Sequence, residues 1–189
     1  MIFGITGGTG CGKTTALEAL HSLGGVCLDC DAIYHDLLKT DKALLAAIEG
    51  RFPGVVKAGQ LDRKALGSRV FADPAALADL NTITHAAVKQ KVLELLPKDG
   101  TPAAIDAIGL FESGLDQLCG VTVGILAPKA DRLRRIMARD GISESYAQMR
   151  LDAQPEDGYF REKCDYILEN TGTEAEFRRK SLDFFQKFL

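Results

Sequence analysis

The chain has 189 residues, of which 46% are hydrophobic and 26% charged, a balance typical of a globular protein with one sizeable core. Its formal net charge of −3 argues against a general surface for nucleic acid or an anionic membrane, and no apolar run reaches membrane-spanning length. The five cysteines are scattered and odd in number, which predicts reduced thiols and a cytoplasmic location. The N-terminus does not resemble a signal peptide, and composition leaves open a monomer or a small homo-oligomer.

A glycine-rich stretch follows the first apolar run. Residues 7–14 read GGTGCGKT and fit G-x-x-x-x-G-K-[ST], between a strand predicted over 2–6 and a helix predicted over 15–23. Glycines let successive backbone amides turn toward phosphate oxygens, and the helix N-terminus adds the positive end of its dipole. Lys13 would reach the β- and γ-phosphates, and the Thr14 hydroxyl would hold Mg²⁺. The stretch predicts a nucleoside triphosphate site; the alternative is a glycine-rich turn with a solvated lysine.

The rest of the chain alternates apolar strands with amphipathic helices. Further strands are predicted over 25–28, 103–107, 121–126 and 166–168, mostly as continuous apolar runs. Helices are predicted within 74–96, which could hold more than one, over 128–139, and from a capping box at Thr173 and Glu176 to the C-terminus. The phenylalanines of the last helix are expected to face the core. This order predicts an α/β fold with a doubly wound parallel sheet, whose ligand lies beyond the carboxyl ends of the strands.

Two segments interrupt the simple alternation. Residues 33–98 form a long, mainly helical excursion, which we interpret as an acceptor-binding insertion within a single domain spanning 1–189. Residues 140–160 are polar and contain Gly141, Pro155 and Gly158, as expected of a mobile lid.

Acidic residues follow two of the predicted strands. Asp29 and Asp31 follow the strand at 25–28, where a carboxylate can accept a proton from an attacking hydroxyl, and Asp31 is also placed to cap the next helix. Both roles can hold for the pair, with one residue capping and the other reacting. Asp106 and Glu112 are further acidic candidates. Asp106 and Gly109 also match the short D-x-x-G element of GTPases, but no [NT]-K-x-D motif accompanies it, and we treat the match as coincidence.

Basic residues are dense over 129–150, and about half are expected to be solvated. Arginines of a lid can neutralise the charge that spreads over a transferring phosphoryl group, so Arg139 is the first choice and Arg150 the second. In the loop, nearby amides and Lys13 are expected to lower the pKa of the Cys11 thiol. Cys27 and Cys30 form a C-x-x-C that is either a zinc or redox pair or two small residues ending a buried strand.

The motifs together resemble the dephospho-CoA kinase family over nearly the whole chain. GITGGTGCGKT at 4–14 is similar to its G-x-T-G-G-x-G-S-G-K-S/T, and the doubled glycine is more discriminating than the generic loop. DCDAI at 29–33 resembles its D-A-D, and LFESGL at 110–115 resembles its L-F-E-S-G-L. Arg139 with Asp140, then Arg150, Gln154 and Asn170, complete the pattern.

The resemblance implies a P-loop kinase fold of three layers, and transfer of a phosphoryl group from ATP to the ribose 3′-hydroxyl of dephospho-CoA, with Mg²⁺. It implies Asp31, Lys13 and Arg139 as catalytic residues and Thr14 as the metal ligand. The implied ATP contacts are Gly8, Thr9, Gly10, Cys11, Gly12, Lys13, Thr14, Thr15, Arg139 and Asn170. The implied acceptor contacts are Asp31, His85, Leu110 and Glu112, although His85 could equally be a buried structural histidine.

The chain departs from the family pattern at a few positions. His35 stands where arginine is common, Ala86 where proline is common, and Ile108 with Gly109 replaces Pro-Leu. Cys11 replaces a loop serine. None of these affects Lys13, so they concern acceptor details and not the reaction. The alternatives are another small-acceptor kinase of this fold, acting on a nucleoside or nucleotide, and a nucleotide-dependent switch without phosphoryl transfer.

Overall fold

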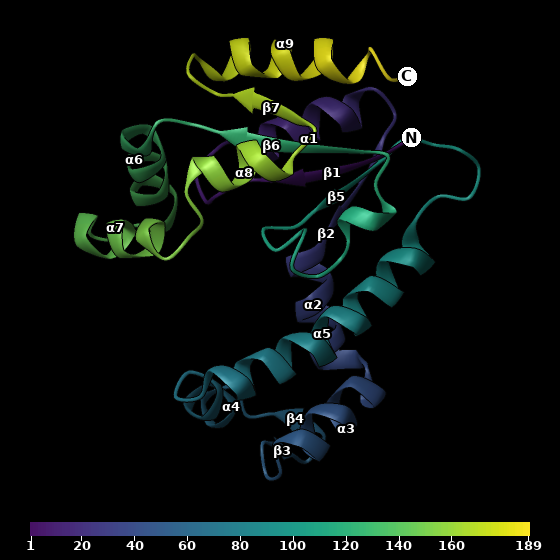
Figure 1. The fold of residues 1–189 in the computed structure, drawn as a ribbon, viewed down its shortest axis with the longest axis vertical. Helices are drawn as coiled ribbons and strands as arrows, with labels where there is room; N and C mark the ends of the chain where they lie inside the picture. The colour runs from purple at the N-terminus through teal and green to yellow at the C-terminus, as the bar shows by residue number, and fades with distance from the viewer. The chain divides into compact units, whose positions relative to one another are not determined.

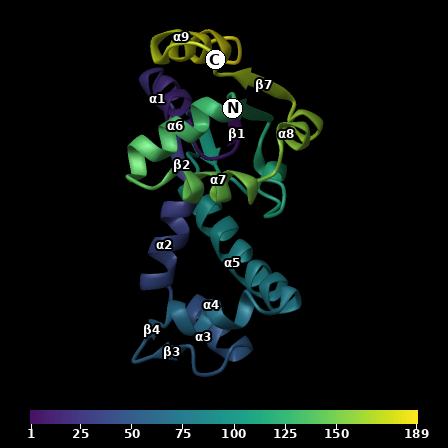
Figure 2. The same ribbon diagram turned by 90° about the vertical axis from the view of Figure 1, so that its left-hand side faces the viewer.

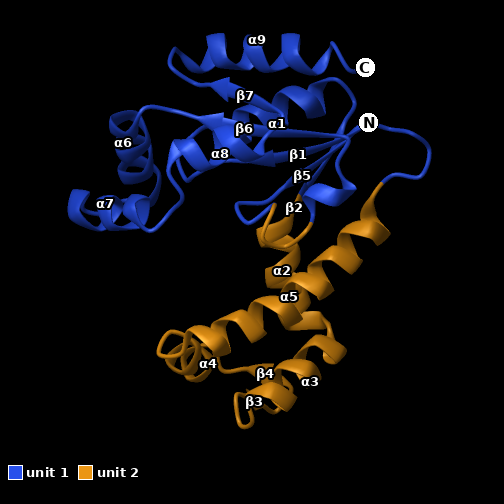
Figure 3. Cartoon of the chain, in the orientation of Figure 1, with its two compact units in different colours: residues 1–28, 97–110, 115–189 blue, residues 29–96, 111–114 orange.

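The computed structural model describes all 189 residues (Figure 1). The chain divides into two compact units (Figure 3). The first contains residues 1–28, 97–110 and 115–189, and the second contains residues 29–96 and 111–114. No helix combines the length and the apolar character that crossing a membrane requires.

The first unit is built on a five-stranded sheet in the order β2-β5-β1-β6-β7. The strands are β1 (Ile2–Thr6), β2 (Val26–Asp29), β5 (Ala103–Asp106), β6 (Val121–Leu126) and β7 (Tyr166–Glu169). The central strand β1 pairs in parallel with both β5 and β6, and β6 pairs in parallel with β7. All of β6 is buried, as its unbroken apolar run predicts for a strand covered on both faces.

Helices and loops cover the two faces of this sheet. Phe3 and Ile5 of β1 face a core cluster that α1 (Lys13–Ser22) and α9 (Glu174–Phe185) complete, and these two helices lie side by side in Figures 1 and 2. Gly4, between them in sequence, faces the opposite side, where Leu110 and Cys119 approach it. On that side α8 (Asp157–Lys163) packs on β6 and β7. The result is the predicted α/β arrangement of three layers.

Aromatic packing fixes α9 to the sheet. The Phe3 ring lies 5.0 Å from Phe185 and 5.7 Å from Phe188, both edge-on. Thr173 and Glu176 form the predicted capping box at the start of α9. The core-facing role predicted for the phenylalanines of this helix is therefore confirmed.

Three further helical segments complete the first unit. They are α6 (Lys129–Asp140), α7 (Glu144–Asp152) and the short 3-10 helix η1 (Asp116–Leu118). The helices α6 and α7 pack on each other around Ile136, Ala147 and Leu151. The predicted lid range 140–160 thus contains α7 and the start of α8.

The second unit is mainly helical. Its elements are α2 (Cys30–Thr40), α3 (Lys42–Arg51), β3 (Val56–Lys57), β4 (Gln60–Leu61), α4 (Arg63–Val70) and α5 (Pro74–Leu95). The long helix α5 packs against α2, α3 and α4. An aspartate side chain accepts a backbone N–H at the start of every helix of this unit: Asp29, Asp41, Asp62 and Asp73.

Two details differ from the sequence-based predictions. Residues 74–95 form one continuous helix, because within this range no proline or glycine follows Pro74, which occupies the first turn. A small antiparallel hairpin, β3–β4, lies inside the excursion predicted as mainly helical. Its turn uses Ala58 and Gly59, whose φ angles of 50° and 76° suit a two-residue hairpin connection.

Candidate active site

The glycine-rich loop connects β1 to α1, as its motif predicts. Gly7, Gly10 and Gly12 have φ angles of 139°, 81° and 102°, which side chains rarely adopt. Gly12 is the N-cap of α1 and no side chain caps the helix. The first-turn amides of α1 can therefore bind an anion, with the helix dipole in support. Lys13 lies back across the loop, and its Nζ donates a hydrogen bond to the carbonyl of Gly7 at 2.9 Å.

Side chains from outside the loop hold three consecutive carbonyls. Arg132 Nε donates to the carbonyl of Thr9 at 3.0 Å, and Arg135 Nη1 donates to that of Gly10 at 3.1 Å. The buried amide of Asn170 donates to the carbonyl of Cys11 at 2.9 Å. In a trans peptide the C=O and the following N–H point in opposite directions. The three bonds therefore turn the N–H groups of the next residues toward the other side of the loop.

A fourth side chain, that of Gln154, binds a backbone N–H of the loop instead of a carbonyl. The N–H of Thr9 donates to Gln154 Oε1 at 2.8 Å, and Gln154 Nε2 donates to Thr9 Oγ1 at 2.6 Å. Arg132 Nη2 also donates to Gln154 Oε1, at 2.9 Å. Gln154 lies between α7 and α8, so the predicted lid range is hydrogen-bonded to the phosphate loop.

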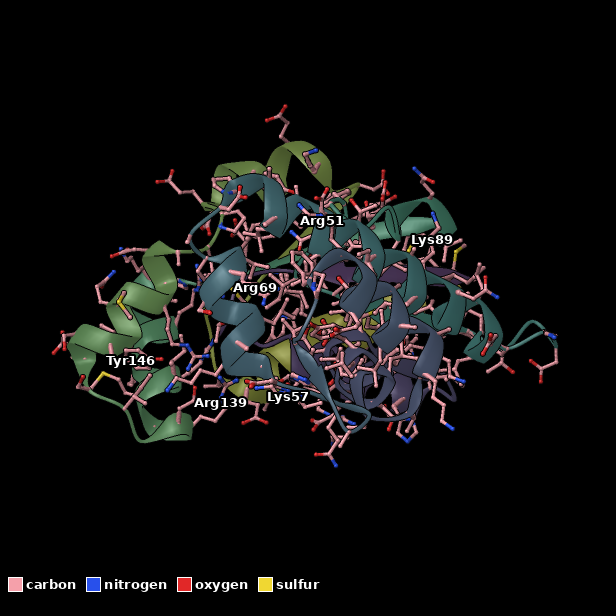
Figure 4. All side chains as sticks on the ribbon, turned by 90° about the horizontal axis from the view of Figure 1, so that it is seen from below. Arg51, Lys57, Arg69, Lys89, Arg139 and Tyr146 are labelled. Carbon is pink, nitrogen blue, oxygen red and sulfur yellow. The ribbon has the colours of Figure 1, made fainter.

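The two arginines favoured by the sequence lie elsewhere on this unit. Arg139, at the end of α6, donates from Nε and Nη2 to the Asp140 carboxylate at 2.7 and 3.0 Å, and Arg150 Nη1 donates to it at 2.6 Å (Figure 4 labels Arg139). These arginines hold the pKa of Asp140 well below its usual range. Arg139 thus lies in the last turn of α6 and is paired with a carboxylate. Its contact with ATP stays a prediction.

Sequence reasoning did not single out Arg132 or Arg135. A signal existed: Arg132 is spaced four residues from Ile136, and both lie on the buried face of α6. An arginine at a core-facing position of a helix requires acceptors, and here the carbonyls of the loop supply them.

The expectation for the Cys11 thiol is wrong. Cys11 is only 1% exposed, and burial raises its pKa above the usual value. The charges of Arg132 and Lys13 act in the opposite direction, but desolvation of the thiolate outweighs them. Cys27 and Cys30 form no disulfide, and the Cys27 thiol donates to the carbonyl of Leu17 at 3.4 Å.

The remaining predicted residues lie mostly in the second unit. The alternative role of Asp31 as a helix cap is wrong, because Asp29 caps α2 by accepting the N–H of Ala32 at 2.9 Å. Asp31 lies in the first turn with an exposed side chain.

The acceptor candidates His85 and Glu112 also belong to the second unit, His85 in α5 and Glu112 in the 111–114 segment. His85 is half-buried, and Lys89, one turn further, donates from Nζ to the carbonyl of Gly114 at 2.9 Å (Figure 4 labels Lys89). This bond places the 111–114 segment, which carries Glu112, along the α5 side that presents His85 and Lys89. Leu110, by contrast, is fully buried in the first unit.

These features define the class of protein. A glycine-rich loop with a lysine joins the first strand of a parallel sheet to an uncapped helix, and basic side chains surround the loop. The chain is a nucleotide-binding α/β protein with the fold of P-loop kinases. Comparison with solved structures agrees. The shikimate kinase of Acinetobacter baumannii shares the fold at 18% identity, with a TM-score of 0.52.

Closer relatives define the family. The family model "Dephospho-CoA kinase" matches residues 1–176. The dephospho-CoA kinase of Anaeromyxobacter dehalogenans is 37% identical over 177 residues, covering 90% of this chain and 84% of that protein. The structure of dephospho-CoA kinase from Campylobacter jejuni is 33% identical, with a TM-score of 0.71 over 99% of this chain and 96% of that one. The structure of TT1252 from Thermus thermophilus is also 33% identical, with a TM-score of 0.84 over 100% and 97%. The chain belongs to the dephospho-CoA kinase family.

Proposed function

We propose that the protein transfers the γ-phosphoryl group of ATP to the ribose 3′-hydroxyl of dephospho-CoA, which gives coenzyme A and ADP. The use of ATP as the phosphoryl donor is supported by the glycine loop at the uncapped N-terminus of α1, to which the Lys13 Nζ is hydrogen-bonded. The identity of the acceptor, dephospho-CoA, is supported by membership of the family.

The loop residues Gly8–Thr15 would bind the phosphates of ATP. Lys13 now donates to a loop carbonyl at 2.9 Å, and would exchange this partner for the β- and γ-phosphate oxygens. Arg139 would face the γ-phosphate after leaving Asp140, and Asn170 would contribute on the adenine side while it supports the loop.

The residues present fit Mg²⁺. Thr14 is exposed in the first turn of α1, and its hydroxyl is the hard oxygen ligand that Mg²⁺ prefers. Asp106 adds a carboxylate at the end of β5, next to β1 in the sheet. Bound with ATP, the ion would neutralise charge on the phosphates, and Thr14 would hold it.

The second unit would bind the acceptor, with Asp31, His85 and Glu112 as its contacts. Leu110, which precedes Phe111 and Glu112 in sequence, would be a further contact. The carboxylate of Asp31 would accept the proton of the 3′-hydroxyl while that oxygen bonds to the γ-phosphorus and the bond to ADP breaks. Asp31 suits this role because its side chain is exposed and is not used to cap α2. The odd, scattered set of five cysteines supports the proposed cytoplasmic location.

A coupled assay of ADP release tests this proposal. Dephospho-CoA should give saturable turnover that requires Mg²⁺, whereas nucleosides, nucleotides and shikimate should not. Turnover on a nucleoside with none on dephospho-CoA would contradict the proposed acceptor, and nucleotide binding without any transfer would favour a switch.

A further inference from the structure

The contacts around Thr9 assign a role to two side chains that the proposed reaction does not otherwise use. We infer that Arg132 and Gln154 are positioning residues, which fix the phosphate loop through Thr9 before the nucleotide binds. The inference rests on the proposed use of ATP, and it concerns how the loop is held, not which acceptor is phosphorylated.

The geometry is a closed triangle of hydrogen bonds. Arg132 Nε binds the carbonyl of Thr9, Gln154 binds both the N–H and the hydroxyl of Thr9, and Arg132 Nη2 binds Gln154 Oε1. All four distances lie between 2.6 and 3.0 Å. Arg132 is buried, and the only carboxylate in its ion-pair range is Asp157, at 4.0 Å. Its charge is therefore compensated mainly by oriented loop and amide oxygens.

This triangle also explains the second glycine of the doubled pair. A Cβ added to Gly8 would fall on the guanidinium of Arg132, with Gln154 Oε1 also close to it. Gly7 is required for a different reason, because its backbone has a positive φ angle and a Cβ there would meet the carbonyl of Ile125. Gly8 thus leaves the space that the two positioning side chains fill.

The contacts give the backbone N–H groups of Thr9 and Gly10 different roles. Gln154 accepts the N–H of Thr9, so within the proposed phosphate-binding stretch Gly8–Thr15 this amide is not one of those that bind phosphate. The bond from Arg132 to the Thr9 carbonyl turns the next N–H, that of Gly10, away from Arg132. A loop held in this shape loses less conformational freedom when ATP binds, and preorganisation of this kind raises affinity.

The test uses a polar-to-apolar change of similar size, Gln154→Met, with Gln148→Met as its matched control. Gln148 lies on α7 of the same segment, and its amide donates only to Asp152, at 2.7 Å. ATP affinity is measured by direct titration, and KM is measured for both substrates. Gln154→Met should weaken ATP binding and raise KM for ATP by about tenfold, the scale of one or two net hydrogen bonds. Gln148→Met should leave both within about twofold.

Three readouts separate positioning from a general structural effect. In Gln154→Met, KM for dephospho-CoA should stay near the wild-type value, and the midpoint of thermal unfolding should fall less than in a variant that leaves a fully buried group unpaired, because Gln154 is only half-buried and water can replace its bonds. Gln154→Glu, which keeps an acceptor for the Thr9 N–H and for Arg132, should recover most of the ATP affinity. Arg132→Lys keeps the charge but cannot reach both acceptors in the same way, so it should also weaken ATP binding.

Two results would overturn the inference. Wild-type ATP affinity in Gln154→Met would show that the triangle does not shape the loop. Wild-type affinity in Arg132→Lys would show that only the charge of Arg132 matters. A wild-type protein that binds no ATP would instead contradict the proposed function, and one that binds ATP but leaves dephospho-CoA unphosphorylated would leave this inference standing.

Discussion

The side chain of Asn170 should control both the stability of the first unit and its affinity for ATP. It is 4% exposed, its Nδ2 donates to the carbonyl of Cys11 at 2.9 Å, and its backbone N–H donates to the carbonyl of Leu126 at 2.7 Å. The first bond ties the loop to the end of β7, and the second ties the end of β7 to β6. Replacing Asn170 with alanine removes the first bond, together with the long 3.5 Å bond that Arg135 Nη2 donates to Asn170 Oδ1, and keeps the second.

The size of the effect follows from what is left behind. The carbonyl of Cys11 loses its donor in a buried site, and an unsatisfied buried polar group costs about 1–3 kcal/mol. For a chain of this size each kcal/mol lowers the unfolding midpoint by about 2–4 °C, so Asn170→Ala should lower it by about 2–12 °C. Because this bond also fixes the peptide whose N–H belongs to Gly12, ATP should bind about tenfold more weakly.

Thermal unfolding followed by circular dichroism and titration with ATP measure these two effects. Asn170→Asp sharpens the test, because it keeps the size of the side chain but offers an acceptor to the Cys11 carbonyl in place of a donor. It should weaken ATP binding as Asn170→Ala does. Asn81→Ala, at an exposed position of α5, is the matched control and should change neither quantity. A wild-type midpoint and wild-type ATP affinity in Asn170→Ala would refute the reasoning.

Further outcomes follow from individual residues of the site. Asp31→Asn should keep ATP affinity but lower turnover by about 10²-fold or more, the scale of losing a general base, and near-normal turnover would remove Asp31 from that role. Lys13→Ala should weaken ATP binding and turnover together, and an unchanged KM for ATP would argue against its phosphate contact. Burial raises the pKa of the Cys11 thiol, so in the nucleotide-free protein Cys11 should react with iodoacetamide more slowly than glutathione does at pH 8. The rate should still rise at higher pH, and a reaction faster than that of glutathione would contradict this expectation. Gly8→Ala should displace the guanidinium of Arg132, so Gly8→Ala and Arg132→Met should weaken ATP binding by similar factors, and losses that add fully in the double variant would count against a shared contact.

Much of the fold could be predicted because its strands are buried on both faces. The apolar runs at 2–6 and 121–126 coincide with β1 and β6, and the other three predicted strands agree with the structure to within a residue or so at either end. The hairpin β3–β4 could not be found by periodicity, because each strand has two residues and shows no repeat. Its only sequence signal is the Ala58-Gly59 pair at the turn.

The site was predicted less completely, because a motif fixes the loop but not what holds it. The spacing of the glycines and Lys13 located the phosphate loop correctly. Which arginines of 129–150 contact the phosphate loop depends on which face of α6 meets the loop. That face is set by the packing of Ile136, which the sequence does not show. The Cys11 pKa was misjudged because sequence shows neighbouring charges but not the depth of burial, which is the larger effect here.

The central claim is that this chain transfers phosphate and does not merely bind or hydrolyse ATP. Incubation with Mg²⁺, ATP labelled in its γ-phosphate and dephospho-CoA, followed by separation of the products, tests it most directly. We predict that the label appears on the 3′-oxygen of coenzyme A, with one ADP formed for each labelled product. Label released as inorganic phosphate, or retained in ATP, would contradict the account.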